Sequence, residues 1–470
     1  MRIIISHLLT IAGFLLALLF IVRLTRENRH PGSTMAWLMA IILIPYIGIP
    51  FYFLFGGRKA KYLINKKNDI YSSLSHDDLQ KRNYKYNVER ILVKGGGAPA
   101  FDGNYLEHFS SGEMAYAKIM EMLEKAEHSI DITAFILGND EVGKSIVDIL
   151  IKKAQEGVKV RLILDSLGCM RTKGRFVDPL RDAGGRIGIF MPMLPFHRKW
   201  SAHLRNHRKM IIIDHRMAVI GGMNFASQYM GPSPDKKRWR DFDILIKGPL
   251  VSECCKIFSA DWHFSTGGEY KNCCWDQDDY SPHNHDRSVT AQIAASGPDV
   301  PHNALSDAIL TALVEAKERI WIITPYFIPD ESLLKSLVLL AGWGRDIRLI
   351  LPSKSNHILA DLARGFYLRT LMENEVKIHF FDAGMLHSKI ILIDDSIAIV
   401  GSANMDIRSF YLNYEIALFI YSAYQVNSIA HIIQRDIFPL THIMQKKRAS
   451  LRRDIKEWME DISRVLSPFL

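Results

Sequence analysis

The sequence predicts an α/β fold made of two similar halves, each with a central mixed β-sheet flanked by helices. The halves are expected to share one active site and to follow an N-terminal transmembrane helical hairpin. Three observations predict this architecture: a polar motif that occurs twice, alternating helix and strand patterns around each copy, and two long apolar runs near the N-terminus. With 470 residues, of which 48% are hydrophobic, the chain can bury two cores of ordinary domain size.

The doubled motif is the most specific feature of the chain. His207-x-Lys209-x4-Asp214 returns as His387-x-Lys389-x4-Asp394, with an apolar run inside each copy. A turn of small residues and an asparagine follow both copies, with Asn224 in the first tail and Asn404 in the second. The two copies match in spacing, in the apolar run inside the motif and in the residues that follow it. This indicates an internal repeat, and therefore one site built from two half-sites.

The segments around the motif copies alternate between helix and strand. Alternating or continuous apolar residues predict the strands. Such alternation in both halves implies sheets that are covered by helices. The predicted helices are 117–126, 142–155, 305–317 and 331–341, and the predicted strands are 129–135, 158–164, 320–326 and 346–351.

Each motif copy is itself predicted to be a buried strand. His207 and Lys209 are two residues apart, so their side chains point to the same face, and the second copy has the same spacing. Asp214 and Asp394 lie off this face by strand parity, which gives them a structural, hydrogen-bonding role. An edge strand with two solvent-reaching polar side chains would explain one copy, but hardly two copies in register.

These residue types suit cleavage of a phosphodiester. A histidine acts as nucleophile when neutral and as acid when protonated, so one histidine per half fills the two roles. Lys209 and Lys389 would hold the phosphoryl oxygens, and Asn224 and Asn404 would donate further hydrogen bonds. Because no chain of Asp, Glu and His has metal-ligand spacing, we expect no metal and no other cofactor.

Each histidine also needs a carboxylate to orient its ring. The candidates are Asp241, in Trp239-Arg240-Asp241, and Glu415, in Asn413-Tyr414-Glu415. They lie at similar distances downstream of the two motif copies, which is what an internal repeat predicts.

The N-terminus carries two apolar runs of about membrane-spanning length, 3–22 and 35–55. A cleavable signal peptide fits poorly, because the first run is long, no A-x-A site follows it, and a second run comes soon after. A buried soluble hairpin also fits less well, because aromatic residues flank the runs and arginines bound them. We therefore expect two transmembrane helices within 1–57.

Charge predicts the topology. Basic residues outnumber acids after the second run until Asp69, so the positive-inside rule places the C-terminal part in the cytoplasm. The five cysteines include two adjacent pairs and form no disulfide framework, which agrees with a reducing compartment. The polar segment 58–100 is expected to be a tether. The net charge of +9 suits an anionic partner, either nucleic acid or anionic lipid.

The doubled motif and its tails resemble the phospholipase D superfamily, whose signature is H-x-K-x4-D followed by G-G/S-x-N. Within that superfamily the chain is similar to bacterial cardiolipin synthases, both in the two N-terminal runs and in segments along the whole chain. These segments include Arg205-Asn206-His207-Arg208-Lys209, Trp239-Arg240-Asp241, Thr324-Pro325-Tyr326-Phe327-Ile328-Pro329 and Leu386-His387-Ser388-Lys389.

The resemblance implies a multi-pass enzyme of the bacterial inner membrane that transfers a phosphatidyl group. One histidine would form a phosphohistidine, and the other would protonate the departing glycerol and then deprotonate the acceptor. Phosphatidylglycerol would be donor and acceptor, so phosphatidylglycerol and other anionic membrane lipids would be the partners, and nucleic acid would not. The resemblance implies His207 as nucleophile and His387 as acid and base, and it carries over the complete motif as the catalytic set: His207, Lys209, Asp214, His387, Lys389 and Asp394.

The implied organisation is a hairpin at 1–57, a tether at 58–100, phospholipase D-like halves at 101–290 and 291–430, and a basic helical segment at 431–470. Two basic stretches, 196–205 and 446–458, would bind anionic headgroups, although an ordinary solvated helix or loop explains each as well. The sequence predicts no oligomeric state.

Three other functions stay open. A hydrolytic phospholipase D, or a phosphatidyltransferase with another alcohol acceptor, would carry the same motif, because only the acceptor pocket differs. A nuclease of the superfamily would suit the net charge, but the apolar hairpin and the lack of a nucleic-acid-binding module argue against it. A non-catalytic membrane scaffold is disfavoured, because both histidines, both lysines and both asparagines are retained.

Overall fold

The computed structural model describes residues 31–44, 46, 49, 52, 84–172, 174–192, 204–268, 288–300, 303–445, 460 and 463. The chain divides into two compact units. The first unit comprises Met1–Lys67 and Pro192–Leu204, and the second comprises Asn68–Met191 and Arg205–Leu470. The second unit therefore holds both copies of the motif.

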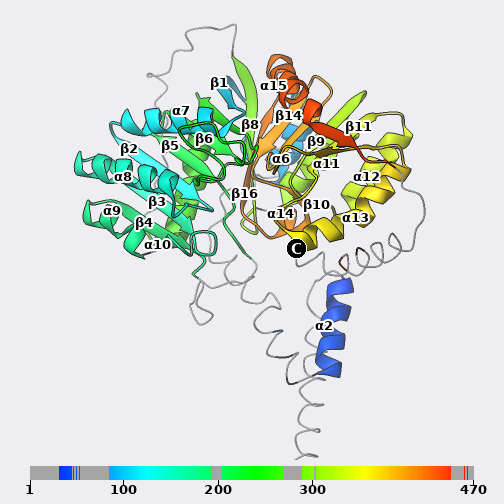
Figure 1. The fold of residues 1–470 in the computed structure, drawn as a ribbon, viewed down its shortest axis with the longest axis horizontal. Coiled ribbons are helices and arrows are strands. Elements are labelled where there is room, and N and C mark those ends of the chain that lie inside the picture. The colour runs from blue at the N-terminus through cyan, green and yellow to red at the C-terminus, as the bar shows by residue number, and fades with distance from the viewer. Residues whose placement is uncertain are drawn as a thin grey trace, which may run out of the picture. The chain divides into compact units, whose positions relative to one another are not determined.

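A mixed sheet of 15 described strands forms the framework of the second unit (Figure 1). Read outward from the centre, the strand order is β1-β7-β6-β5-β2-β3-β4 on one side and β8-β16-β14-β13-β9-β11-β12-β17 on the other. Apart from the terminal β17, the two sides have the same order and directions, so the predicted internal repeat is confirmed. The strands of the first half are β1 (Phe101–Phe109), β2 (Ser129–Ala134), β3 (Lys159–Asp165), β4 (Arg186–Phe190), β5 (Met210–Ile213), β6 (Met217–Gly221) and β7 (Asp243–Lys247). Those of the second half are β8 (Val289–Ser296), β9 (Arg319–Ile323), β11 (Asp346–Pro352), β12 (Lys377–Phe381), β13 (Ile390–Ile393), β14 (Ile397–Gly401), β16 (Glu415–Ile420) and β17 (Thr441–Ile443), and a separate parallel pair joins β10 (Phe327–Ile328) to β15 (Met405–Asp406).

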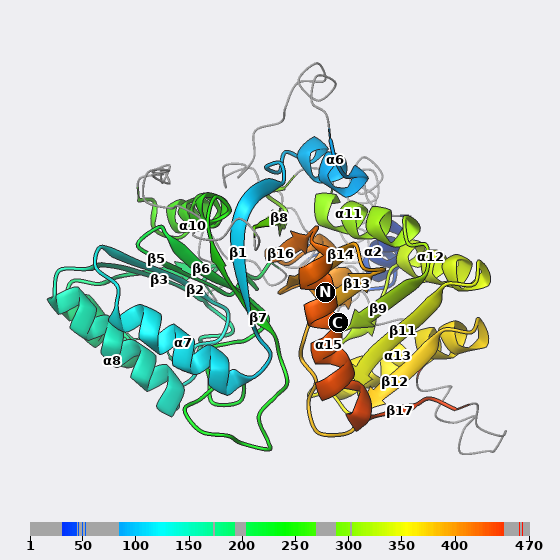
Figure 2. The same ribbon diagram turned by 90° about the horizontal axis from the view of Figure 1, so that it is seen from above.

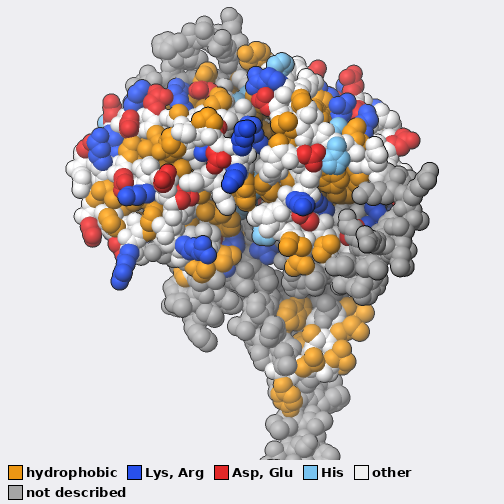
Figure 3. All heavy atoms as spheres, viewed as in Figure 1, with side chains coloured by type: hydrophobic (Ala, Val, Ile, Leu, Met, Phe, Trp, Pro, Cys, Tyr) orange, Lys and Arg blue, Asp and Glu red, His pale blue; other side chains and the backbone are white. Residues whose placement is uncertain are grey.

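Helices cover both faces of each half of the sheet. Figure 2 shows α7 and α8 on one face of the first half with α10 on the other, and α15 on the opposite face of the second half from α11 and α12. The surface in Figure 3 intersperses basic and acidic side chains, so the net charge of +9 forms no single patch on that face. The helices are α6 (Asn87–Lys94), α7 (Gly112–Glu124), α8 (Glu141–Gln155), α9 (Asp178–Asp182), α10 (Val251–Thr266), α11 (Ala304–Val314), α12 (Glu331–Gly342), α13 (Ile358–Glu373), α14 (Ile407–Tyr411) and α15 (Ala423–Asp436), with the 3-10 turns η1 (Gly174–Phe176) and η5 (Phe438–Leu440).

All eight helices and strands predicted around the motif copies are present, with differences only at their ends. Short polar residues fix several of the starts: Ser111 accepts a hydrogen bond from the Met114 amide at the start of α7, and Asp140 accepts one from Gly143 at the start of α8. The motif strands β5 and β13 are buried at every position, as their continuous apolar runs predict.

The tether prediction is wrong for residues 84–100. Residues Asn87–Lys94 form α6, which packs on α11 and buries Val88 and Leu92. The contact is tight: a Cβ added to Gly95 would lie 2.4 Å from Cβ of Ala304. The segment as a whole is rich in Lys and Asn, so its composition gave no sign of one short amphipathic helix, in which Val88 and Leu92 lie four residues apart on one face and Val93 is buried beside them.

Two predicted boundaries also need correction. The boundary between 290 and 291 falls inside β8, and the boundary between 430 and 431 falls inside α15. Residues 431–445 are the end of α15 followed by η5 and β17, and β17 pairs with β12. This part of the predicted C-terminal segment therefore belongs to the second half, while most of 446–470 lies outside the described residues.

In the first unit, α2 (Pro31–Leu43) is a helix of 13 residues. Its Trp37 ring meets the Tyr52 ring edge to face, with centroids 5.4 Å apart. No helix in the described part of the chain is both long and apolar enough to cross a membrane. The predicted span 3–22 and the basic stretch 196–203 lie outside the described residues, as do 45, 47–48, 50–51 and 53–55 of the second predicted span.

Candidate active site

Both copies of the motif lie at the edge of the sheet where β2 and β9 end. Met210, the first residue of β5, pairs with Thr133 near the end of the antiparallel strand β2, and Ile390 of β13 pairs with Ile323 at the end of β9. The histidine and lysine of each copy therefore lie beyond the carboxyl end of the neighbouring strand. The strands begin three residues later than predicted, because the backbone of each histidine bonds to the other half of the protein.

These backbone bonds join the halves in two equivalent places. The His207 amide donates to the Tyr414 carbonyl at 2.9 Å, and the Tyr414 amide donates to the Arg205 carbonyl at 2.8 Å. In the second copy the His387 amide donates to the Arg240 carbonyl at 2.6 Å. Asn206 and Tyr414, and Arg240 and Leu386, thus form short parallel bridges between the halves.

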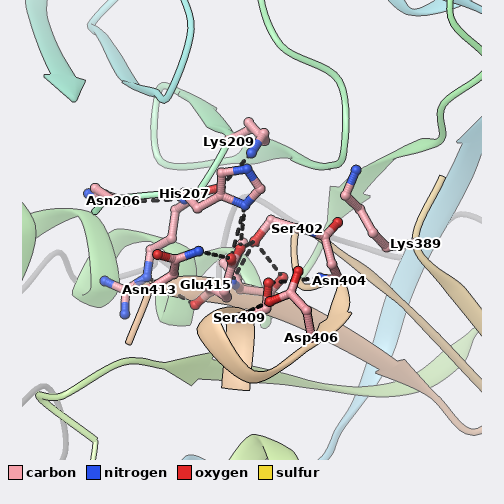
Figure 4. A network of polar contacts seen from close by, with 12 residues as sticks. Asn206, His207, Lys209, Lys389, Ser402, Asn404, Asp406, Ser409, Asn413 and Glu415 are labelled. Carbon is pink, nitrogen blue, oxygen red and sulfur yellow. Dashed lines mark hydrogen bonds and ion pairs between the residues drawn. The ribbon is translucent and has the colours of Figure 1, made fainter. Parts of the chain in front are cut away.

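The carboxylates that orient the histidines cross between the halves. Nδ1 of His207 lies 2.9 Å from each carboxylate oxygen of Glu415, and Nδ1 of His387 lies 2.6 Å from Oδ2 of Asp241. Figure 4 shows the first of these pairs. The two predicted carboxylates do meet the two histidines. Their partners, however, come from opposite halves, so either half alone holds an incomplete site.

The small residues in the motif tails border these carboxylates. Ser402 donates a hydrogen bond from its hydroxyl to Glu415, as Figure 4 shows. Gly222 holds the equivalent position in the first half, where an added Cβ would lie 2.2 Å from Oδ1 of Asp241. The glycine therefore leaves room for the Asp241 carboxylate, which accepts a hydrogen bond from the Phe242 amide at 2.8 Å. The sequence analysis did not predict this contact between the small residues of the tails and the carboxylates.

The motif lysines are buried beside the histidines. Nζ of Lys209 donates to the His207 carbonyl at 2.8 Å and lies 5.0 Å from the centre of the Phe135 ring. Nζ of Lys389 lies 2.7 Å from Nδ1 of His387 and 3.9 Å from Oδ2 of Asp241. Each lysine thus follows its histidine to the same face, as the two-residue spacing predicts.

The two asparagines of the tails are placed differently. Oδ1 of Asn224 accepts a hydrogen bond from the Ile136 amide at 3.2 Å, so this oxygen is used within the first half. Asn404 stands between Glu415 and Lys389 in Figure 4, and no donor among the described residues reaches its buried Oδ1. An amide positioned in this way can bind a polar group of a ligand.

Burial sets the charge of the site. It lowers the pKa of His207, and for His387 burial and the charge of Lys389 lower the pKa to about 3. Burial also lowers the pKa of Lys209 to about 7 and that of Lys389 to about 8, against the opposing charges of Glu415 and Asp241. Both imidazoles are therefore neutral at neutral pH, which is the form in which a histidine can act as a nucleophile.

Two buried acids near the site have pKa values that are shifted in opposite directions. For Glu415, burial acts to raise the pKa, but the charge and hydrogen bond of His207 outweigh burial and the pKa is lowered. Burial and the charge of Asp241 raise the pKa of Asp243 to about 8. Within the described residues, no group of three or more His, Cys, Asp or Glu is arranged to hold a metal ion.

Asp214 and Asp394 lie at the far ends of the motif strands, away from the histidines. Asp214 accepts hydrogen bonds from the backbone amides of 127–129, at 3.0, 2.7 and 2.7 Å. Asp394 does the same for the amides of 317–319, at 2.8, 2.9 and 2.9 Å. Both have positive φ, near +50°, which Asp tolerates in tight turns. Their inclusion in the catalytic set is therefore corrected to the structural role that strand parity indicated.

We expect Asp214→Ala to lower stability without changing the chemistry. Three amides lose a charged acceptor, so the free energy of unfolding should fall by about 2–4 kcal/mol. Denaturant unfolding measures this loss, and Asp395→Ala is the matched control because that side chain is 65% exposed. A normally stable Asp214→Ala protein with a lost kcat would contradict the structural assignment.

Sequence reasoning missed a buried ion pair behind His207. Arg208 is fully buried and donates to both carboxylate oxygens of Asp261 on α10, at 2.8 and 2.9 Å. Its other nitrogens donate to the Glu415 carbonyl at 3.1 Å and to the Ser296 carbonyl at 3.0 Å. Arg208 thus fixes His207 and Glu415 from behind. The available signal was one acid, Asp261, in an otherwise apolar part of a helix.

Comparison with known proteins shows the family to which this chain belongs. The family model described as "Cardiolipin synthase, PLD-like domain" matches residues 119–262 and 309–437, and the model "Phospholipase_D-nuclease N-terminal" matches 14–57. The chain belongs to the cardiolipin synthase family of the phospholipase D superfamily. Members of this family are phosphatidyltransferases, and the two matched segments each contain one copy of the motif.

Relatives in this family match almost the whole chain. Cardiolipin synthase 1 of Bacillus cereus is 34% identical over 464 residues, which cover 94% of this chain and 90% of the relative. The major cardiolipin synthase of Bacillus subtilis is 31% identical, with 99% of both chains covered. The crystal structure of a phosphatidylserine synthase from Haemophilus influenzae has a TM-score of 0.58 at 15% identity, covering 81% of this chain and 98% of that one. This last likeness supports the fold alone.

Proposed function

We propose that this membrane-associated cardiolipin synthase transfers a phosphatidyl group from one phosphatidylglycerol to another through a phosphohistidine. The crossed arrangement of the two histidines and the two carboxylates carries the proposal. In the first step Nε2 of one histidine bonds to phosphorus as the bond to glycerol breaks. In the second step the hydroxyl of another phosphatidylglycerol displaces the histidine. The products are cardiolipin and glycerol.

His207 is assigned as nucleophile. Glu415 lies against Nδ1, which favours the tautomer with its proton on Nδ1 and leaves the lone pair of Nε2 for attack. The lowered pKa of His207 supports the neutral form before attack. As the bond to phosphorus forms, the ring gains positive charge, and Glu415 stabilises that charge.

His387 is assigned as acid and then base. Its pKa of about 3 in the free protein makes it neutral, so it must gain a proton before it can protonate glycerol. An anionic phosphodiester bound beside it, together with Asp241, favours the imidazolium. After glycerol leaves, the neutral ring accepts the proton of the incoming hydroxyl. Each turnover therefore returns His387 to the imidazolium form that it has when substrate is bound.

Lys209 and Lys389 are assigned to the non-bridging phosphoryl oxygens, and the Asn404 amide to a further hydrogen bond. Both ammonium groups are almost fully buried, where a charge interacts more strongly than in water. Such fixed positive charge offsets the negative charge that builds up as phosphorus becomes five-coordinate.

The lysine pKa values predict how the rate depends on pH. In the free enzyme the charge of Lys209 is lost through about pH 7 and that of Lys389 through about pH 8. We expect kcat/KM to fall as pH rises through this range, while kcat falls at higher pH because the bound phosphodiester raises both pKa values. Initial rates from pH 5.5 to 9.5 measure this, with thermal unfolding at each pH as the control. A kcat/KM that stays flat to pH 9.5 would contradict the role of the lysines.

The products test the function directly. Full-length enzyme is incubated with labelled phosphatidylglycerol, with and without EDTA. We expect cardiolipin and free glycerol in equal amounts, and the same rate in EDTA. Phosphatidic acid as the main lipid product would indicate a hydrolase, and a new phosphatidyl ester formed only on addition of another alcohol would indicate a different acceptor.

We also propose that 1–57 forms two transmembrane helices and that the catalytic part is cytoplasmic. The apolar runs and the basic residues after them support this topology. Protease added to inside-out vesicles should digest the catalytic part, whereas digestion only in right-side-out vesicles would reverse the topology.

A further inference from the structure

We propose that two loops, one from each half, dock the active site onto a bilayer that contains phosphatidylglycerol. Loop 1 comprises the described residues 166–172 and 174–177, after β3, and loop 2 is 353–359, which runs from the end of β11 into the first two residues of α13. They hold equivalent places in the internal repeat, because β3 and β11 have equivalent positions in the sheet. This inference rests on the proposed function, since it concerns how a lipid substrate reaches the site.

Both loops expose large apolar side chains. Leu167 and Met170 of loop 1 are 44% and 61% exposed, and Ile358 and Leu359 at loop 2 are 77% and 50% exposed. A single exposed apolar side chain is ordinary. A pair at equivalent places in both halves, beside a site for a lipid, indicates a surface that meets the membrane.

The loops lie at the same sheet edges as the histidines. β3 runs parallel to β2, and β11 runs parallel to β9, so the loops leave at the carboxyl ends beyond which His207 and His387 lie. In loop 1 the Leu167 amide donates to Asp165 at 2.8 Å, and Asp165 also accepts the amide of Asn206 at 3.0 Å. One carboxylate therefore connects this loop to the residue that precedes His207.

Loop 2 contacts Tyr326, which follows β9 at the end of that strand beyond which His387 lies. The Tyr326 hydroxyl donates to Asn356, and the Tyr326 ring lies 5.4 Å from the ring of His357. The backbone of this loop is also held, because the Ser355 amide donates to Asp361 at 2.8 Å. Loop 1 is held in the same manner by the buried Cys169, whose Sγ lies 3.3 Å from the Leu137 amide. Ordered backbone thus presents the apolar side chains.

Charge identifies the membrane surface as anionic. Loop 1 carries Arg171 and Arg175, loop 2 carries Lys354, and no described residue of either loop is an acid. Arg171, Arg175 and Lys354 are exposed. Basic side chains beside inserted apolar ones suit a layer of phosphatidylglycerol headgroups, which is the pool from which the substrate comes.

The other edge of the sheet offers a matched control. Val314 and Trp343 are 55% and 61% exposed, but Val314 ends α11 and Trp343 follows α12, so both lie near the starts of β9 and β11. They match the loop residues in exposure and differ in position. If exposed apolar area alone mattered, changing them would have the same effect as changing the loops.

The test compares two substrates on full-length enzyme in phosphatidylcholine vesicles. One substrate is long-chain phosphatidylglycerol within the bilayer, and the other is dihexanoyl phosphatidylglycerol dissolved below its critical micelle concentration. The variants are Leu167→Ser/Met170→Ser and Ile358→Ser/Leu359→Ser, with Val314→Ser/Trp343→Ser as control. We expect each loop variant to lose about tenfold or more in kcat/KM on the bilayer substrate and less than about twofold on the dissolved one. The control should change neither.

Two results would overturn the docking proposal. An unchanged rate on the bilayer substrate would show that the loops do not dock, and an equal loss on both substrates would show that they shape the site instead. Thermal unfolding of each variant verifies that the fold is intact. Failure of the wild-type enzyme on both substrates would instead contradict the proposed function, so the two failures are distinguishable.

Discussion

We expect His207→Ala and His387→Ala each to reduce cardiolipin formation by at least about 10⁴-fold, and the two variants to fail at different steps. Without His207 no covalent bond to phosphorus forms. Without His387 the nucleophile is intact and only the proton for the departing glycerol is missing. The difference appears with a substrate whose leaving group needs no proton, such as the p-nitrophenyl ester of phosphatidic acid.

With that substrate, His387→Ala should release nitrophenolate in a burst equal to the enzyme concentration and accumulate a phosphohistidine. Acid-quenched samples mapped by mass spectrometry under alkaline conditions should carry the phosphatidyl group on His207. His207→Ala should give neither burst nor label. His215→Ala is the matched control, because this histidine lies just after the motif with 34% of its side chain exposed. Label on His387 in the wild-type enzyme would reverse the two roles.

The crossed carboxylates predict the second large effect. Glu415→Gln should resemble loss of His207, and Asp241→Asn should resemble loss of His387, each with a fall in kcat of about 10³-fold or more. Glu415 lies on the second half and contacts His207 of the first. If each carboxylate instead acted on the histidine of its own half, the effects of the two substitutions would be exchanged. The p-nitrophenyl substrate separates the two: it should restore the burst to Asp241→Asn and leave Glu415→Gln without one.

A double-mutant comparison checks the pairing. Residues that act through one another are strongly non-additive, so His207→Ala/Glu415→Gln should be no slower than His207→Ala. His387→Ala/Asp241→Asn should likewise equal His387→Ala. Additive losses in these pairs, together with non-additive losses in His207→Ala/Asp241→Asn, would contradict the crossed arrangement.

Local sequence patterns predicted much of this protein correctly. The run Met210–Ile213 is buried on both faces because a continuous apolar run with three isoleucines suits a central strand. The spacing of His207 and Lys209 placed both beside the site, and the odd spacing to Asp214 placed that carboxylate elsewhere. Each of these inferences uses a period that the backbone fixes within a few residues.

What the sequence did not predict depends on contacts between distant segments. The pairing of His207 with Glu415 joins residues on opposite halves, and no local period encodes which carboxylate meets which histidine. The ion pair between Arg208 and Asp261 likewise joins the segment before β5 to α10. α6 was missed because its buried apolar side chains, Val88, Leu92 and Val93, are too few to stand out in a polar segment.

The central claim is that each transfer passes through a covalent bond to His207 inside one site made by both halves. The most direct test is the stereochemical course at phosphorus, with phosphatidylglycerol made chiral by sulfur in place of one non-bridging oxygen. Two in-line displacements, first by histidine and then by the acceptor hydroxyl, predict cardiolipin with net retention of configuration, as read by ³¹P NMR. Net inversion would mean a single direct displacement and would contradict the phosphohistidine.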